Sequence, residues 1–343
     1  MQAEFAAACN LVVPFARDNR CWNRVALHHL AYYKVRETSP LGSQMICNAI
    51  KSVADAYKVL KLRKADEVPT VAFRPTGSVH FDARTFSLKG NTVSLYTLEG
   101  RIKAKCILGE FQTDYLAAGK PKEAELIRKG RQWFLNLVLD LPDAPPISGG
   151  KIGVDVGENN LAASSTGKVW GGGQLRHHRD IYLAHRRRLQ SNGSRAAKRK
   201  LKAISGREQR HVRHVNHETS KAIITEAISS GAGEIRMEDL THIRANIKAG
   251  KRIRTRLHRW AFRQLQDFVA YKAEGVGLRV VYVNPAYTSQ TCSVCGEIGK
   301  RVKHHFACSC GNLAHSDVNA SRNIAGFASP IGLARAVVTQ PEF

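Results

Sequence analysis

The stretch Lys151-Ile-Gly-Val-Asp-Val-Gly157 predicts a buried β-strand that carries an acid in its middle. Side chains alternate between the two faces of a strand, so the valines take one face and Asp155 takes the other. The glycines on either side leave room for another backbone to come close. A turn-forming role would explain Asp155 equally well from this stretch alone, so its meaning depends on which other acids the fold brings near it.

Two further acids occupy comparable positions along the chain. Gly233-Glu-Ile-Arg-Met-Glu-Asp-Leu240 predicts a second strand with Glu238 at its end, and Asp317 begins a helix predicted over 317–324. Taken singly, Glu238 is explained as a solvated strand end, and Asp317 as a helix N-cap that contributes about 1 kcal/mol. Asp239 is the main rival to Glu238.

The order strand-Asp, strand-Glu, helix-Asp predicts an α/β fold, because an RNase H-like (RuvC-like) sheet brings these three elements together. Phosphodiester hydrolysis is served by two divalent ions about 4 Å apart, which convergent carboxylates hold. Mg²⁺ prefers hard oxygen ligands and keeps several waters, so a few carboxylates suffice. We therefore predict that Asp155, Glu238 and Asp317 are catalytic and bind two Mg²⁺ ions.

A second metal site is predicted near the C-terminus, where four cysteines form two close pairs, each followed by a glycine. The pairs are Cys292-x-x-Cys295 and Cys308-x-Cys310. Their spacing predicts a tetrahedral zinc ribbon, and its role is structural because four thiolates close the coordination shell. The histidines His304, His305 and His315 are alternative ligands that four sulfurs make unnecessary. A redox pair is the remaining alternative.

Charge is the unusual property of the composition. The 343 residues include 53 Lys and Arg against 28 Asp and Glu, a net charge of +25, which normally marks a nucleic-acid partner. The excess is clustered over residues 176–213, so a merely solvated basic surface is the weaker explanation. The side chains predicted to grip phosphates through counterion release are Arg186, Arg187, Arg188, Lys198, Arg199, Lys200, Arg252, Arg254, Arg256 and Arg259. Trp260, Tyr287 and Phe306 are candidates for stacking on bases, with a core role as the alternative.

Changes in apolar spacing along the chain indicate several domains. The predicted ranges are a helical lobe at 1–62, a β-rich barrel or small sandwich at 63–142, a Pro- and Gly-rich linker at 143–150, a nuclease domain at 151–287, a zinc-ribbon insert at 288–313, a final nuclease segment at 314–327 and a tail at 328–343. Within the β-rich part, strands are predicted at 68–73, 78–82, 92–96, 102–108 and 133–139. Gly193 and Gly206 interrupt the basic region, which predicts a helical hairpin rather than one rod.

The remaining four of the eight cysteines are scattered, which indicates reduced thiols rather than a disulfide scaffold. We find neither an apolar run of bilayer length nor a signal peptide, and so expect a cytoplasmic, nucleoid-associated protein.

Five motifs carry a resemblance to a known family. They are Gly153-Val-Asp-Val-Gly157, Ile235-Arg-Met-Glu238, Tyr271-Lys-Ala-Glu274, Asn284-Pro-Ala-Tyr-Thr-Ser-Gln290 running into Cys292-Ser-Val-Cys-Gly296, and Asp317-Val-Asn-Ala-Ser-Arg-Asn-Ile324. These motifs resemble TnpB (OrfB), the RNA-guided nuclease that insertion sequences encode and that is related to type V CRISPR effectors. The resemblance covers about 150–326 strongly and the N-terminal half more weakly. The chain is expected to be shortened at its N-terminus relative to the family, and its second cysteine pair is tighter than the commoner C-x-x-C.

The resemblance implies a function and partners. Asp155, Glu238 and Asp317 would be a RuvC-like triad, and the cysteines would form a target-nucleic-acid-binding insert. Residues 1–62 would be a recognition lobe and the β-rich part a wedge that holds RNA. A guide RNA from the element's own end would direct DNA cleavage, with base pairing reading the sequence. A companion transposase is a further partner that the resemblance allows. Two alternatives remain: a nuclease-inactive RNA-guided repressor, and a transposase that performs strand transfer.

Overall fold

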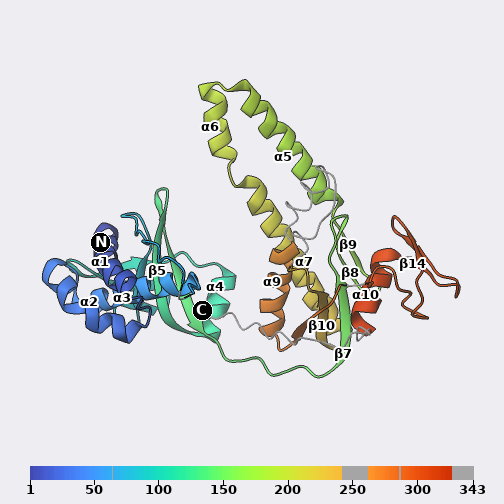
Figure 1. The fold of residues 1–343 in the computed structure, drawn as a ribbon, viewed down its shortest axis with the longest axis horizontal. Coiled ribbons are helices and arrows are strands. Elements are labelled where there is room, and N and C mark those ends of the chain that lie inside the picture. The colour runs from blue at the N-terminus through green and yellow to red at the C-terminus, as the bar shows by residue number, and fades with distance from the viewer. Residues whose placement is uncertain (64, 242–261, 286, 327–343) are drawn as a thin grey trace. The chain divides into compact units, whose positions relative to one another are not determined.

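The computed structural model describes residues 1–343 except 64, 242–261, 286 and 327–343. The chain divides into two compact units, Met1–Pro142 and Asp143–Phe343, and each is described by itself (Figure 1). The boundary lies where the Pro- and Gly-rich segment begins.

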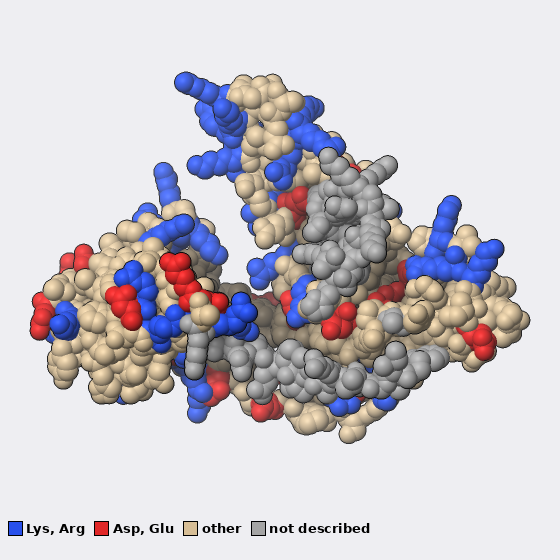
Figure 2. Space-filling model, in the orientation of Figure 1, with Lys and Arg blue, Asp and Glu red and all other residues tan. Residues whose placement is uncertain are grey.

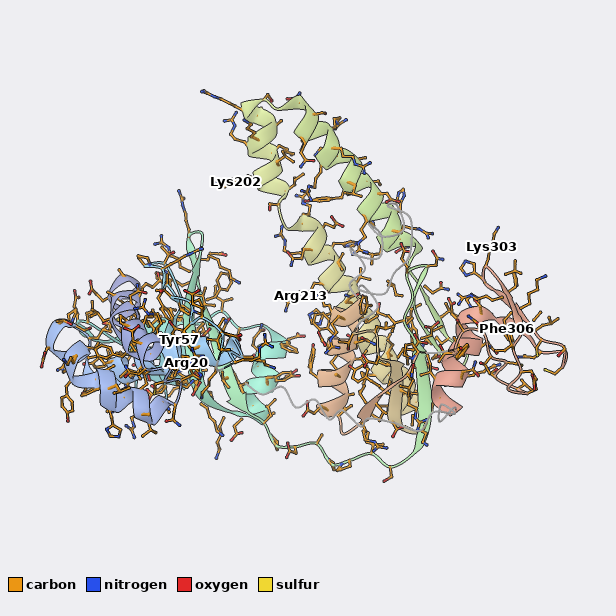
Figure 3. All side chains as sticks on the ribbon, in the orientation of Figure 1. Arg20, Tyr57, Lys202, Arg213, Lys303 and Phe306 are labelled. Atoms are coloured by element: carbon orange, nitrogen blue, oxygen red, sulfur yellow. The ribbon has the colours of Figure 1, made fainter. Side chains whose placement is uncertain are left out.

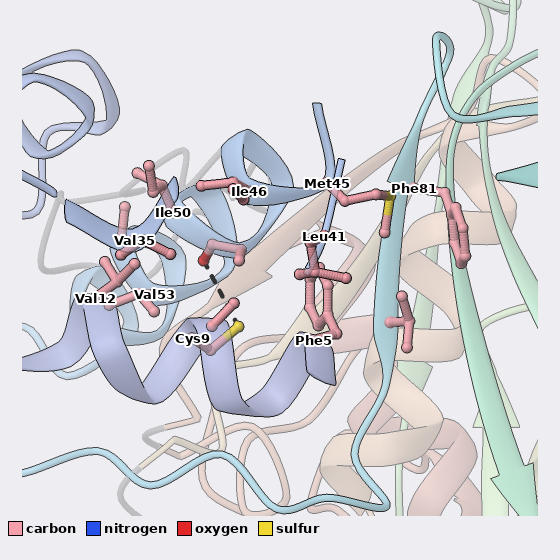
Figure 4. Close-up of a cluster of buried hydrophobic side chains, with 14 of the residues drawn as sticks. Phe5, Cys9, Val12, Val35, Leu41, Met45, Ile46, Ile50, Val53 and Phe81 are labelled. Carbon is pink, nitrogen blue, oxygen red and sulfur yellow. Dashed lines mark hydrogen bonds between the residues drawn. The ribbon is translucent and has the colours of Figure 1, made fainter. Parts of the chain in front are cut away.

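The first unit begins with three helices, within the segment predicted as a helical lobe. They are α1 (Gln2–Asp18), α2 (Arg24–Thr38) and α3 (Ser43–Val59). Their apolar faces form one buried core, in which Val12, Ile46 and Ile50 are fully enclosed (Figure 4). The thiol of Cys9 lies in this core and contacts the carbonyl oxygen of Ala49.

Two three-stranded antiparallel sheets follow, in the orders β1-β5-β6 and β2-β3-β4. The elements are β1 (Val79–Asp82), β2 (Phe86–Lys89), β3 (Thr92–Thr97), β4 (Gly100–Lys105), α4 (Glu110–Ala118), β5 (Lys120–Lys129) and β6 (Gln132–Asp140). Helix α4 and strands β2 and β5 were not among the predicted elements.

The strand predicted at 68–73 was wrong, because this segment has no regular structure. Side chains of the helices, and not a neighbouring strand, form hydrogen bonds with its backbone. The hydroxyl of Tyr57 donates to the carbonyl of Pro69 (3.0 Å), and Asn10 both donates to and accepts from the backbone of Phe73 (2.9 Å each) (Figure 3 labels Tyr57). A chain whose polar backbone groups are satisfied in this way needs no sheet partner.

The second unit is built around a five-stranded sheet in the order β11-β10-β7-β8-β9. Strand β7 runs parallel to β10, β10 runs parallel to β11, and β8 and β9 are antiparallel to their neighbours. The elements are β7 (Gly150–Asp155), β8 (Asn160–Ser164), β9 (Val169–Gly171), α5 (Gly173–Asn192), α6 (Arg195–Ile204), α7 (Arg207–Ser229), β10 (Ala232–Glu238), α9 (Phe262–Glu274), β11 (Arg279–Val283), β12 (Lys300–Val302), β13 (His305–Ala307), β14 (Leu313–His315) and α10 (Ser316–Gly326).

Helices cover both faces of this sheet, and the alternation along β7 decides which residue faces which helix (Figure 1). Ile152 and Val154 join the buried core with residues of α7 and α9. Gly153 faces α10, where a Cβ atom would lie 1.9 Å from the carbonyl oxygen of Ser321 and 2.6 Å from the backbone nitrogen of Ala325. Helix α10 therefore packs backbone to backbone on β7, and only glycine fits beneath it.

The predicted helical hairpin is confirmed. The basic region forms α5 and α6 and continues into α7, with breaks at Gly193 (φ 64°) and Gly206 (φ 73°). Both glycines adopt the left-handed conformation that other residues avoid. Many Lys and Arg side chains project from this hairpin (Figure 2).

In the described part of the chain, none of the helices combines the length and apolar character that a bilayer crossing requires.

Candidate active site

The structure brings Asp155, Glu238 and Asp317 together. Strands β7 and β10 are parallel neighbours in which Val154 pairs with Met237, so the next residues, Asp155 and Glu238, lie at the same edge of the sheet. Both side chains face α10, because the intervening apolar residues pack on the other face. The first turn of α10 carries Asp317 to the same place, and all three acids line one cavity of about 280 Å³.

The sequence predicted Asp155 in the middle of its strand. This position was wrong, because Asp155 is the last residue of β7. The sheet pairing stops at this point. Strand β10 ends at Glu238, and the last pair between β7 and β8 is Asp155 with Ala163. An acid at this edge points into a crevice at the carboxyl ends of parallel strands, where open α/β sheets bind their ligands.

The pKa values of two of the acids show that their ionised forms are unfavourable in this arrangement. Burial, followed by the charges of Glu238 and Asp317, raises the pKa of Asp155 from 3.8 to about 8, while Arg301 opposes the rise. Burial also raises the pKa of Glu238, against the Thr288 hydroxyl and Arg301, which both lower it. Buried carboxylates crowded in this way are stabilised by a cation. The donor set and its charge therefore fit divalent metal ions.

Arg301 lies beside the acids but was not among the residues singled out from the sequence. It lies on β12, in the cysteine-rich segment, and its Nη2 atom donates to Oδ1 of Asp317 at 2.9 Å. Asn160 donates to Oδ2 of the same carboxylate at 2.9 Å. Arg301 also lines the cavity, so a fixed positive charge faces the acids. Nothing in the local sequence distinguishes it from the other basic residues; only the tertiary contact does.

Two asparagines of α10 hold the loop that precedes the cysteines. Asn323 donates to the carbonyl oxygens of Thr288 (2.8 Å) and Thr291 (2.7 Å). Asn319 donates to that of Thr291 (2.7 Å) and accepts from the backbone nitrogen of Ser293 (2.9 Å). The loop so held directs the Thr288 hydroxyl to a carboxylate oxygen of Glu238. The motif Asp317-Val-Asn-Ala-Ser-Arg-Asn thus supplies one acid and positions a second.

The four cysteines also converge. The Sγ atoms of Cys292 and Cys310 lie 3.7 Å apart, those of Cys295 and Cys308 3.5 Å apart, and all four within 4.8 Å of one another. Burial works against ionisation of Cys292, but backbone N–H groups and the Asn312 amide outweigh it and lower the pKa of this thiol to about 6. The cluster is able to bind zinc through thiolates.

The cluster is carried by a small antiparallel sheet, β12-β13-β14. Phe306 is only 1% exposed beneath it, so it is core and not a base-stacking residue, which corrects that candidate (Figure 3). Tyr287 is 68% exposed, and Trp260 lies outside the described residues.

The structure describes six of the ten basic residues that were predicted to contact phosphates. Arg186, Arg187 and Arg188 are exposed on α5, and Lys198, Arg199 and Lys200 are exposed on α6. Arg252, Arg254, Arg256 and Arg259 lie outside the described residues. The six residues on α5 and α6 are not among those that line the acid cavity.

Comparison with known proteins agrees with these features. Residues 136–244 match the OrfB_IS605 family model, described as a probable transposase, and residues 262–324 match the Cas12f1-like TNB domain. The TnpB-like protein MJ0751 of Methanocaldococcus jannaschii is 46% identical over 107 residues, which is 31% of this chain and 38% of that protein. Over these stretches the chain resembles the TnpB (OrfB) family.

Other relatives are CRISPR-associated nucleases. The endodeoxyribonuclease Cas12f1 of Sulfoacidibacillus thermotolerans is 46% identical over 114 residues, which is 32% of this chain and 26% of that protein. The matched stretches thus span well under two thirds of these curated relatives. A cryo-EM structure of a Cas12f1–sgRNA–target DNA complex superposes with a TM-score of 0.67 at 15% identity, covering 94% of this chain and 81% of that one. The mixed α/β fold is therefore similar to that of Cas12f1.

Proposed function

We propose that the protein is an RNA-guided, divalent-metal-dependent DNA endonuclease encoded by a mobile element. The observation that carries this proposal is the convergence of Asp155, Glu238 and Asp317 on one cavity at the edge of a mixed sheet. The similarity to the TnpB (OrfB) family over residues 136–244 and the Cas12f1-like fold support it. In this proposal the second unit is an RNase H-like (RuvC-like) nuclease domain that carries a structural zinc ribbon at 288–313. The first unit would hold the recognition lobe and the wedge.

The three acids would hold two Mg²⁺ ions. When bound, such ions activate water and stabilise the leaving oxygen of a phosphodiester. The protein's own residues prepare the site. Thr288 orients Glu238, and Asn160 and Arg301 orient Asp317. Arg301 also offers a positive charge to a phosphate that enters the cavity.

The exposed basic residues of the helical hairpin form the proposed nucleic-acid contact. We expect Arg186→Gln, Arg187→Gln and Arg188→Gln together to weaken nucleic-acid binding and to reduce the slope of log K against log [salt] by about 2–3, since each lost phosphate contact removes about 0.9 from the duplex slope. Fluorescence anisotropy over a salt series measures this slope. An unchanged slope would remove these arginines from the interface.

Thr288 provides a test of how the acids are positioned. Replacing it by valine keeps the shape of the side chain but removes the hydroxyl that donates to Glu238. We expect Thr288→Val to weaken Mg²⁺ binding by about 10–100-fold, as outer-shell losses do, while Thr288→Ser stays near wild type. Isothermal titration with Mg²⁺ distinguishes the two variants. Equal affinities for them would show that the hydroxyl has no such role.

The raised pKa of Asp155 predicts a pH dependence of stability. Between its ordinary value of 3.8 and about 8, the folded protein holds a proton that the unfolded chain has lost. Stability in Mg²⁺-free buffer should therefore fall as pH rises through this window. The measurement is Tm against pH for wild type and for Asp155→Asn, which has no titrating group there. Wild type should lose more stability than the variant over the window, whereas parallel curves would refute the shift.

The proposal as a whole is tested by sequencing the RNA that copurifies with the protein and assaying cleavage of DNA matching that RNA. Guided cutting that requires Mg²⁺ supports it. Guided binding without cutting would favour a repressor, and strand joining would favour a transposase. Absence of bound RNA at low salt would remove the guided part of the proposal.

A further inference from the structure

A cluster of two histidines and one acid lies beside the cysteine cluster but is separate from it. His304, His315 and Asp317 each direct one ligand atom into a group whose members lie within 4.8 Å of one another. His304 precedes β13, His315 ends β14, and Asp317 lies in the first turn of α10. The two imidazole rings stack with centroids 5.5 Å apart and an angle of 22° between their planes. Both histidines belong to the segment that carries the cysteines, and His304 lines the acid cavity together with Asp317.

The spacing is close to that of a coordination shell. An ion with bonds of about 2.0–2.1 Å holds tetrahedral ligand atoms roughly 3.4 Å apart. The group therefore needs to contract by an ångström or so, and His304 is the side chain able to supply this movement. It is exposed and follows Lys303, whose φ is 55° in the turn between β12 and β13. Its backbone is held, since its carbonyl oxygen accepts from the backbone nitrogen of Ser316 at 2.9 Å.

The carboxylate of Asp317 has a lone pair available for a metal ion. A carboxylate offers about four acceptor positions. Among the described residues, Arg301 and Ser316 donate to Oδ1 of Asp317, and Asn160 donates to Oδ2. A position on Oδ2 is thus available to a metal. His315 lies beside the same carboxylate, since its Nδ1 accepts a hydrogen bond from the backbone nitrogen of Asp317 at 3.3 Å. A metal bound by either ring nitrogen of His315 would replace this hydrogen bond, because the other nitrogen must then carry the ring proton.

We propose that His304, His315 and Asp317 bind a transition-metal dication such as Zn²⁺, Co²⁺ or Ni²⁺. Imidazole nitrogen suits these ions, whereas Mg²⁺ prefers carboxylate and water oxygens. The histidines are not needed by the cysteine cluster, whose four sulfur atoms complete a shell by themselves. The proposal stands on this cluster alone and does not require that the protein cut DNA.

Because Asp317 would belong to both sites, a metal ion bound at one site affects the other. Asp317 is also a proposed Mg²⁺ ligand, so an ion held by the histidines competes for it. If the proposed nuclease activity holds, Zn²⁺ added to a Mg²⁺ reaction should inhibit cleavage, and His304→Ala should make cleavage less sensitive to Zn²⁺. The histidines would then tune the metal response of the acid cavity.

The direct test is Co²⁺ binding, measured by visible absorption in the absence of nucleic acid. The zinc-loaded full chain is titrated with Co²⁺, and we expect ligand-field bands without sulfur-to-cobalt charge transfer. His304→Ala and Asp317→Asn should each weaken Co²⁺ binding by about tenfold or more, since even outer-shell losses cost this much. His305→Ala is the matched control, because this adjacent exposed histidine is not in the group, and its affinity should equal that of wild type.

Three results would overturn the proposal. The first is the absence of ligand-field bands, and the second is bands accompanied by sulfur charge transfer alone, which would place the ion among the cysteines. The third is equal weakening by His304→Ala and His305→Ala. A loss of fold is recognised by a lowered Tm in the same samples, and a ring-preserving His304→Phe variant that keeps the wild-type Tm then repeats the comparison. Because binding is read without cleavage, a failed nuclease assay leaves this result interpretable.

Discussion

Asp155→Asn and Glu238→Gln should each reduce DNA cleavage by about 10³-fold or more. Each variant removes a charge that the proposed ions require, and metal ions contribute several kcal/mol to such reactions, where each 1.4 kcal/mol is a factor of ten. Nucleic-acid binding should remain, because the basic hairpin lies away from the cavity lining. Single-turnover cleavage rates, with binding measured on the same preparations, test the expectation.

Asp239→Asn is the matched control for this experiment. Asp239 is the next residue after Glu238 and carries the same charge, but it is exposed and its Oδ1 accepts from the backbone nitrogen (3.0 Å) and the hydroxyl of Thr241. An asparagine oxygen makes the same contacts. We expect near wild-type cleavage from Asp239→Asn. Loss of activity in Asp239→Asn with retention in Glu238→Gln would exchange the roles of the two acids.

Cys292→Ser should unfold the zinc ribbon and thereby disable the acid cavity. Structural zinc supplies about 10–16 kcal/mol of folding free energy in zinc-finger peptides, far more than a three-stranded sheet of this size supplies by packing. Two contacts that depend on the ribbon would be lost with it, Arg301 to Asp317 and Ser293 to Asn319. We expect loss of bound zinc, new protease sites within 288–313 and loss of cleavage.

Cys106→Ser is the control for the cysteine variant, since Cys106 is a half-buried free thiol in the first unit. It should keep the zinc content and the protease pattern of wild type. The first unit has its own core, so its helices should survive in Cys292→Ser as well. Unchanged zinc content in Cys292→Ser would contradict the assignment of the four cysteines.

The sequence was most informative about the two acidic strands, where side-chain alternation and the pairing of the strands together determine the positions of the acids. Alternation along 151–157 and 233–240 predicts two strands with acids turned away from the apolar core, and the parallel pairing of β7 with β10 then places Asp155 beside Glu238. The glycine breaks of the basic hairpin were predictable for a similar reason. Both residues occupy positive φ, which local sequence encodes directly.

The sequence was least informative where a contact joins distant residues. Arg301 meets Asp317 and Thr288 meets Glu238 only after the sheet and α10 have formed, so no local pattern marks either one. Strand β5 was missed because its sequence, Lys-Pro-Lys-Glu-Ala-Glu-Leu-Ile-Arg-Lys, is dominated by charges; only Ala124 is fully buried. The run 68–73 shows the reverse, an apolar segment whose backbone is satisfied by Tyr57 and Asn10.

The most direct test of the central claim is anomalous scattering from a crystal of the protein soaked in Mn²⁺, which takes the same oxygen ligands as Mg²⁺. We predict two manganese peaks about 3.5–4 Å apart, ligated by Asp155, Glu238 and Asp317. Peaks only elsewhere on the protein, or an acid cavity that stays without manganese at saturating concentration, would contradict the account.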